Sequence, residues 1–266
     1  MTEAHEGASV ARWDIVEGFR SWRLWAYMGL VDIRQRYRRS MVGPIWLVLG
    51  LGVTVLGIGL LYSTILHTDP HFYIPFISIS LLIWNFISTC LGESTGVLPS
   101  YSSIILSGRV PYSSFILRII VRNLIVAAHC IVVVVIAFAF YGKAVSILAL
   151  GAVPGVLLLV ANLYWMMLAI AMVSARYRDV AQIVNYLIQI IFFLTPVIWQ
   201  PSQIGPRATL KQINPFYHLL EAIRAPVFDG HIPLASLIYS SVMLVIGLTV
   251  TLLLFVRFRR NVVHWI

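Results

Sequence analysis

The sequence predicts an all-α polytopic membrane protein with six transmembrane helices. Of the 266 residues, 60% are hydrophobic and only 11% are charged, and the mean hydropathy is +0.90. A soluble globule cannot bury so large an apolar excess. The chain also has room for about six apolar runs of roughly 20 residues, the length that crosses a hydrocarbon core. Its basic residues gather at the ends of these runs.

The net charge of +9 does not indicate nucleic-acid binding, because the 19 basic residues follow the pattern that sets membrane orientation. With the amino terminus inside, 15 basic residues fall in the predicted inner segments and four in the outer ones. This bias predicts that both termini are cytosolic. Cys90 and Cys130 both lie inside apolar runs, so we expect no disulfide and no zinc site.

Residues 1–44 are expected to form a cytosolic tail and an interface helix. Residues 1–11 are polar and small and predict a mobile tail. From Trp13 to Arg36, apolar residues recur at near-helical spacing against charged ones. This pattern predicts an amphipathic helix in the membrane interface, with a plain cytosolic helix as the alternative. Because the first apolar run begins only near Ile45, after seven arginines, the region is not a signal peptide.

The transmembrane domain is expected to occupy residues 45–266. Its first span, residues 45–66, carries glycines on closely spaced turns, which favours close helix packing in lipid. The outer turn at residues 67–71 contains two histidines and an aspartate, but nothing nearby completes a ligand set, so no metal site is predicted. A second span follows over residues 72–92. The segment 94–112 is too long for a simple turn and predicts a short cytosolic helix.

The third and fourth spans are set by charge and length. Arg118 and Arg122 would each cost about 2.5–3.5 kcal/mol near the bilayer centre. We therefore expect the third span to cross over residues 123–141 and its helix to project below the membrane. The uncharged residues 144–175 would measure about 48 Å as one helix, which exceeds one crossing, so a break or kink is expected at Pro154–Gly155.

The fifth span is predicted over residues 180–199. Its amides, Asn185 and Gln189, must face protein or water, so one face of the helix either lines a passage or bonds to neighbouring helices. Residues 200–233 are too polar to span and too apolar for a free loop, which predicts short re-entrant helices in the outer leaflet. The last span covers residues 234–256.

Several enzyme motifs are absent from the sequence. It contains no G-x-x-x-x-G-K-[ST] phosphate loop, no G-x-S-x-G elbow and no H-E-x-x-H. No Asp or Glu lies within the six predicted spans, which disfavours coupling to protons or sodium ions. Energy for uphill transport is then expected from another subunit. His129, inside the third span, is expected to be a packing residue.

The apolar region begins with a recognisable motif. Residues 37–46 read Tyr-Arg-Arg-Ser-Met-Val-Gly-Pro-Ile-Trp and resemble the R-Y-R-R-S-x-L-G-P-x-W signature of the membrane subunits of bacterial polysaccharide ABC exporters. This is the ABC type-2 class, which exports O-antigen, capsule or teichoic acid. Val42 replaces the usual Leu, a mild apolar change. A second likeness, to the family's outer segment before its last span, lies in Asn214–His218, Glu221, Arg224 and Asp229–Gly230.

The resemblance implies a permease subunit in the bacterial inner membrane. It would form a homodimeric pore with two copies of a separate ATPase, and it would move a lipid-linked polysaccharide, with O-antigen as the first candidate. ATP and Mg²⁺ would bind to the ATPase, and this chain would bind no cofactor. The segment 94–112 would dock on the ATPase. The coupling candidates in it are Ser94, Leu98, Tyr101, Ile105 and Arg109.

The polymer would pass between two copies along the first and fifth spans. Aromatic rings suit this path because sugar rings present apolar C–H faces; ordinary packing is the alternative. The channel-lining candidates are Tyr62, Tyr186, Gln189, Phe192, Phe193 and Trp199. Arginines before the first span are candidates for the pyrophosphate of a polyprenyl-linked substrate, because a guanidinium fork suits phosphate oxygens. Their alternative role is to set topology and bind anionic lipid.

These arginines are Arg34, Arg36, Arg38 and Arg39. The signature loop around them contributes Tyr37, Ser40, Gly43, Pro44 and Trp46. Two other functions stay open: an ABC exporter of drugs or other lipids, and a membrane-embedded enzyme that uses His129 or His218.

Overall fold

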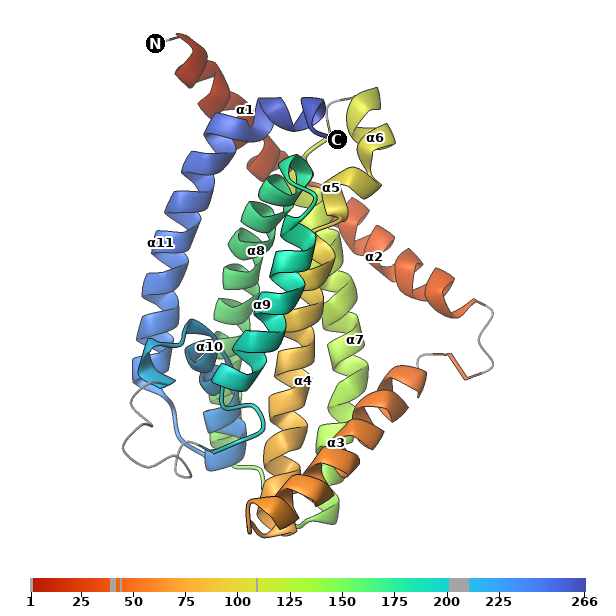
Figure 1. The fold of residues 1–266 in the computed structure, drawn as a ribbon, viewed down its shortest axis with the longest axis vertical. Helices are drawn as coiled ribbons and strands as arrows, with labels where there is room; N and C mark the ends of the chain where they lie inside the picture. Colours follow the sequence, from red (N-terminus) through yellow and green to blue (C-terminus); the bar gives the residue numbers. More distant parts are fainter. Residues whose placement is uncertain (1, 39–41, 44, 109, 201–210) are drawn as a thin grey trace.

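The computed structural model describes residues 2–38, 42–43, 45–108, 110–200 and 211–266, with the side chains of these residues except 2–8, 36, 37 and 260. Regular secondary structure in these ranges is entirely helical (Figure 1). Five helices are long and apolar enough to cross a membrane, which confirms the all-α, multi-pass class. They are α3 (Ile45–Ile65), α4 (Pro70–Ser94), α7 (Tyr112–Phe140), α8 (Ala152–Arg176) with the short η1 (Ile147–Gly151) before it, and α11 (Leu234–Phe258).

The predicted fifth span is shorter than a full crossing. Helix α9 (Val180–Leu194) has 15 residues, or about 22 Å, against a hydrocarbon core of about 30 Å. It ends because Thr195 precedes Pro196, and proline drives the residue before it out of the helical region. Thr195 accordingly has φ −91° and ψ 136°. The prediction that this helix continues to Trp199 is therefore wrong.

The amino-terminal region contains two helices, α1 (Thr2–Arg20) and α2 (Trp22–Tyr37), where one was predicted. Residues 2–11, predicted as a tail, lie within α1. The chain bends at Ser21, which has φ −76° and ψ 28°. Both helices pack against α7 (Figure 1), and a Cβ built at Gly18 would lie 2.5 Å from Cβ of Ser113. The glycine is what permits this approach of α1 to α7.

Helix α7 is continuous from Tyr112, so Arg118 and Arg122 lie on an extension that precedes the predicted span, as expected. The break in the fourth apolar run comes earlier than predicted. It falls between η1 and α8, and Pro154 lies in the first turn of α8, where no backbone N–H is needed. Proline therefore starts this helix and does not kink it.

Short helices occupy the two segments where they were predicted. Helices α5 (Val97–Ser100) and α6 (Ser102–Ser107) lie between α4 and α7, at the same end of the bundle as α1 and the carboxyl terminus (Figure 1). Helix α10 (Pro215–Arg224) and the π-turn η3 (Ala225–Asp229) lie at the opposite end, before α11. A final short helix, η4 (Arg259–His264), follows α11.

Helix α4 is the centre of the bundle. It packs against α3, α7, α8, α9 and α10, and most of its side chains are buried. This fits its sequence, which is apolar around the whole circumference. Helix α3, in contrast, buries only one narrow face, formed by Leu51, Val55, Gly59 and Ser63. Much of α3 is thus left uncovered within a single chain.

Candidate transport path and coupling site

The signature loop joins α2 to α3 through Gly43. This residue has φ +60°, in the left-handed region that strains any residue with a Cβ, which explains the glycine. Arg34 and Arg38 are exposed, and Trp46 at the start of α3 is 60% exposed. The remaining predicted members of the loop lie outside the described residues or side chains: Arg36, Tyr37, Arg39, Ser40 and Pro44.

Two arginines of α7 hold α2 to the bundle. Arg118 binds Asp32 through two hydrogen bonds: its Nε donates to Oδ2 at 2.7 Å, and a second guanidinium nitrogen donates to Oδ1. Arg122 pairs with Glu93 of α4 and lies 3.6 Å from Oδ2 of Asp32. Asn123 donates to Oε2 of Glu93 at 2.8 Å. These carboxylates let both arginines lie close to the membrane-spanning part of α7.

Four of the predicted coupling residues face the protein. Leu98 is fully buried and Ile105 is 4% exposed. Ser94 is buried and donates to the carbonyl of Leu91. The Tyr101 ring stacks on Phe115 with 4.6 Å between centroids. These side chains attach the segment to its neighbours and offer little surface to a partner.

The exposed apolar side chains of the coupling segment are Ile104, at 41%, and Leu106, at 58%. Arg109 lies outside the described residues. The sequence predicted Ile105, which lies between Ile104 and Leu106, as a coupling residue. Apolarity alone does not tell which side of a six-residue helix is buried. In the structure, Ile104 and Leu106 are large apolar side chains that this short helix leaves exposed.

A buried carboxylate joins the coupling segment to both ends of the chain. Asp14 in α1 is fully buried, and its Oδ2 accepts from the N–H of Tyr112 at 2.9 Å. Its Oδ1 accepts from the N–H and the hydroxyl of Ser113, at 3.0 and 2.9 Å. Arg259 pairs with it at 2.8 Å. Asp14 thus caps the amino end of α7. Sequence reasoning missed it because Tyr112 and Arg259 lie 98 and 245 residues away along the chain.

Helix α9 presents the clearest candidate transport surface, because it buries none of its residues within one chain. Tyr186 is 62% exposed and Phe193 is 67% exposed, and Gln189 is exposed beside them. The other channel-lining candidates are half-buried. Phe192 packs on Trp84 at 5.6 Å between centroids, Trp199 donates to the carbonyl of Phe193 at 2.9 Å, and Tyr62 packs against the core.

Two polar side chains of α4 are also candidates. Asn85 and Thr89, one turn apart, are exposed on a helix that is otherwise mostly buried. They line a cavity of about 200 Å³ whose other wall includes Leu47 and Leu51 of α3. On the α9 side, a Cβ built at Gly92 of α4 would lie 3.7 Å from Oδ1 of Asn185.

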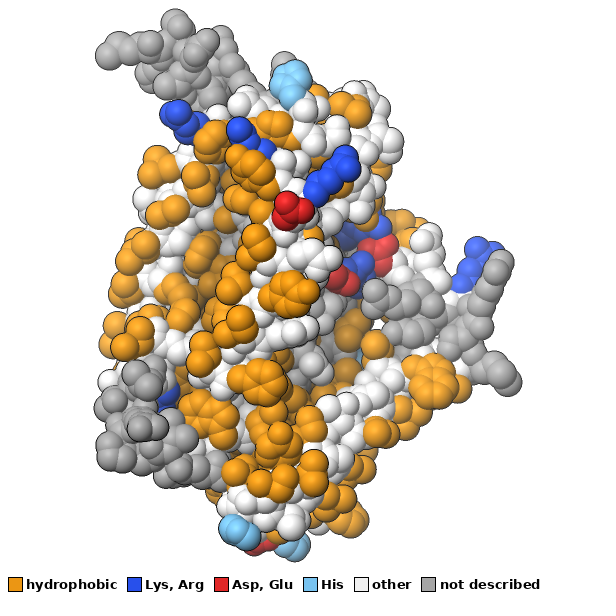
Figure 2. Space-filling view, viewed as in Figure 1, with side chains coloured by type: hydrophobic (Ala, Val, Ile, Leu, Met, Phe, Trp, Pro, Cys, Tyr) orange, Lys and Arg blue, Asp and Glu red, His pale blue; other side chains and the backbone are white. Residues whose placement is uncertain are grey.

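We call Asn85, Thr89, Asn185 and Gln189, with the rings of Tyr186 and Phe193, the polar–aromatic face. On the side of the molecule seen in Figure 2, charged side chains gather mainly at the end with α1, α5 and α6. Sequence reasoning found the α9 half of this face and missed the α4 half. The sequence does contain a signal for the α4 half, because Asn85 and Thr89 lie four residues apart, on one side of a helix, within an apolar run.

The outer segment anchors the end of α9. Asn214 caps α10, accepting from the N–H of Phe216 at 2.9 Å, and its Nδ2 donates to Oγ1 of Thr195 at 2.9 Å. Arg224 is 2% exposed and donates to the carbonyl of Pro196 at 2.7 Å. Burial raises the pKa of Tyr217 to about 12, above its usual value of 10. Asn214 and Arg224, two residues of the second motif, thus fasten α10 to the end of α9.

The two histidines considered for catalysis differ in their surroundings. Both ring nitrogens of His218 have a hydrogen-bond partner. Nε2 lies 2.9 Å from the carbonyl oxygen of Gln212, and Nδ1 lies 3.1 Å from Oγ of Ser236. His129 is exposed on α7, with Nδ1 2.7 Å from the carbonyl of Ile125. Across the described part of the chain, no three His, Cys, Asp or Glu side chains come together as a metal site. The contacts of His218 favour a packing role, whereas His129 makes one hydrogen bond within its own helix.

Comparison with known proteins gives two similarities. Residues 24–228 match the family described as ABC-2 type transporter, a stretch that runs from α2 to η3. The chain is also similar to the O-antigen export system permease protein RfbA of Myxococcus xanthus. The two are 23% identical over 219 residues, which cover 79% of this chain and 84% of that protein.

Proposed function

The chain belongs to the ABC-2 type transporter family, and from this membership we propose that it is the membrane subunit of an exporter of a lipid-linked polysaccharide, with O-antigen as the first candidate. The family's membrane domain is a transport subunit without the ATPase domain, so a separate partner would bind ATP and Mg²⁺. Two copies of each subunit would assemble in the bacterial inner membrane, with both termini of this chain in the cytosol. The similarity to an O-antigen export permease supports this cargo.

The polar–aromatic face is the observation that carries the proposal. Its amide and hydroxyl groups suit the hydroxyl edges of a sugar chain, and its rings suit the apolar C–H faces. Asn85, Thr89, Asn185 and Gln189 are all uncharged and all exposed within one chain. An apolar drug or lipid would gain nothing from four such groups. This chemistry favours a hydroxyl-rich polymer over either of those cargoes.

The uncovered faces of α3 and α9 support a homodimer. In an apolar stretch of 18 residues of α3, only 17% are buried within one chain. Cβ atoms built at Gly50 and Gly57 would meet nothing within 4 Å. Polar side chains at membrane depth are costly when they face lipid. A second copy of the chain, facing the first across the polar–aromatic face, would exclude lipid and leave a passage for the polymer between them.

Arg34 and Arg38 are proposed to hold the pyrophosphate of the carrier lipid, together with Arg36 and Arg39. The two described side chains are exposed close to the loop that enters α3, where a substrate headgroup at the membrane surface can reach them. Guanidinium groups bind phosphate oxygens through paired hydrogen bonds. Arg38→Ala is then expected to abolish export, while membrane insertion and association with the ATPase stay intact.

An export assay tests the path. In cells that depend on this chain for surface polysaccharide, the double variant Asn85→Leu, Gln189→Leu should lower export roughly tenfold, as expected from the loss of two hydrogen bonds of ~0.5–1.5 kcal/mol each. Val250→Leu, at a 51% exposed position of α11, is the matched control and should export normally. Normal export by the double variant, at equal protein level in the membrane, would exclude this face as the path.

A further inference from the structure

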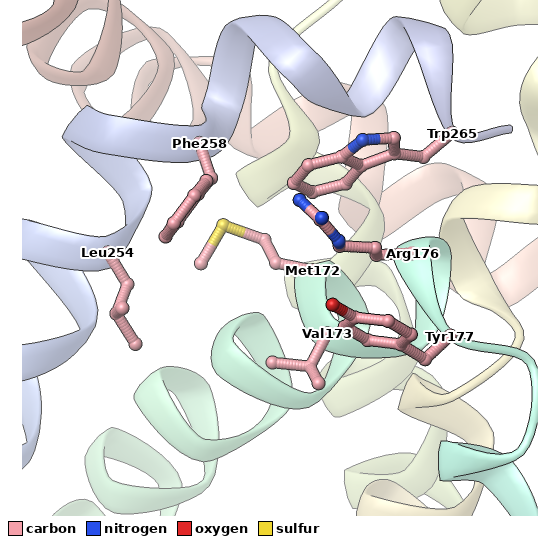
Figure 3. A pocket seen from close by; sticks show the side chains of 7 residues that line it. All are labelled: Met172, Val173, Arg176, Tyr177, Leu254, Phe258 and Trp265. Carbon is pink, nitrogen blue, oxygen red and sulfur yellow. The ribbon is translucent and has the colours of Figure 1, made fainter.

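A cavity of about 350 Å³ lies between the ends of α8 and α11 (Figure 3). Its apolar walls include Met172 and Val173 of α8, and Leu254 and Phe258 of α11. It reaches the surface of the molecule, because Val173 is 43% exposed. The cavity is therefore accessible from the surrounding lipid or water.

One cation, Arg176, lies at the rim of this cavity. Its guanidinium carbon is 5.2 Å from the ring centroid of Tyr177 and 5.1 Å from that of Trp265. Figure 3 shows the guanidinium group below the Trp265 indole, beside the open space. None of the ion pairs in the described part of the chain includes Arg176. The two rings hold the group in place while its N–H donors stay free of a carboxylate.

The cavity lies at the depth of lipid headgroups. Arg176 is the last residue of α8, and Phe258 is the last residue of α11. Both helices are apolar membrane spans, so their shared end marks one boundary of the hydrocarbon layer. Tyr and Trp beside an arginine are typical of that boundary, where rings contact chains and the cation contacts headgroups. This placement holds for either orientation of the chain.

We propose that this cavity binds an anionic phospholipid of the surrounding bilayer. The phosphate contacts Arg176 between Tyr177 and Trp265, and the first part of one acyl chain lies against Val173, Leu254 and Phe258. The residues that line the cavity include one cation and no acid, so an anionic headgroup is favoured over a zwitterionic one. The site is independent of the transported substrate and does not depend on the proposed function.

Native mass spectrometry of the purified chain, exchanged into equal phosphatidylglycerol and phosphatidylcholine, tests the site. Arg176→Gln should lower the ratio of retained phosphatidylglycerol to phosphatidylcholine about fivefold, because it removes the direct hydrogen bonds between the guanidinium group and the phosphate. Arg178→Gln removes the same charge two residues away, outside the lining, and should leave the ratio within about twofold of the parent.

A second variant separates the cavity from the charge. Val173→Phe fills the space at an exposed position while Arg176 is retained, and it should also lower phosphatidylglycerol retention. Unchanged retention in Arg176→Gln or in Val173→Phe would overturn the proposal. An equal loss in Arg178→Gln would overturn it too, because the preference would then come from surface charge in general.

Discussion

At the scale of single residues, Asp14 links segments that lie far apart in the sequence. It accepts hydrogen bonds from the first two residues of α7 and pairs with Arg259 beyond α11. The α7 residue Ser113 in turn accepts from the hydroxyl of Tyr164 in α8 at 3.1 Å. Three helical elements, α1, α7 and η4, thus meet at one carboxylate next to the coupling segment, and Ser113 links α8 to it.

Asp14→Asn is expected to destabilise the chain by about 3 kcal/mol, because an amide turns a donor toward N–H groups and leaves Arg259 without its buried partner. Unfolding of the purified chain in mixed micelles, titrated with denaturing detergent, measures this. Asp179→Asn is the matched control. Asp179 is exposed and its side chain makes no capping bond, so its replacement should change stability by less than about 0.5 kcal/mol. Equal midpoints for both variants would contradict the role given to Asp14.

Single side chains could be predicted from the sequence more easily than their partners. The energetic cost of burying Arg118 and Arg122 correctly predicted a helix that extends beyond the span. It did not identify Asp32 and Glu93 as their partners, because those residues come from other helices. In the coupling segment, residue type predicted Leu98 and Ile105 as contacts, but both side chains are turned into the protein.

At the scale of elements, close approaches between helices depend on single glycines. A Cβ built at Gly155 of α8 would lie 2.3 Å from the carbonyl oxygen of Ala222 in α10. Gly155→Ala should therefore force the two helices apart and cost about 1–3 kcal/mol. In a monomeric preparation, the same change at Gly57 of α3, where nothing of the chain lies within 4 Å, should stabilise that helix by about 0.5–1 kcal/mol. Thermal unfolding in detergent compares the two; a loss at Gly57 equal to that at Gly155 would contradict this packing.

The bounds of α3, α4 and α11 followed from the sequence to within two residues. Helix α3 begins at Ile45 and ends at Ile65, within one residue of its prediction. Helix α9 did not follow, because Pro196 ends it before the apolar run ends. The interface region also differed, since a bend at Ser21 carries no strong signal in an otherwise helical pattern.

At the scale of the whole molecule, the features form two groups. Near the end that holds both termini are the coupling segment, the Asp14 junction and the proposed lipid cavity (Figure 1). From there the polar–aromatic face follows α4 and α9 toward α10 and η3. The class of the protein could be predicted from composition and motif. The α4 half of the polar–aromatic face required the packed helices, because exposure is a property of the assembled bundle.

ATP hydrolysis by the chain and its ATPase partner, reconstituted together in proteoliposomes, tests the central claim most directly. Lipid-linked polysaccharide should raise the hydrolysis rate several-fold, and the same glycan cleaved from its lipid should not, because recognition is proposed to need both the pyrophosphate and the sugar chain. The double variant Asn85→Leu, Gln189→Leu should bind the ATPase and lose most of the stimulation. Equal stimulation by apolar drugs or free lipids, or none by the lipid-linked glycan, would contradict export of a polysaccharide.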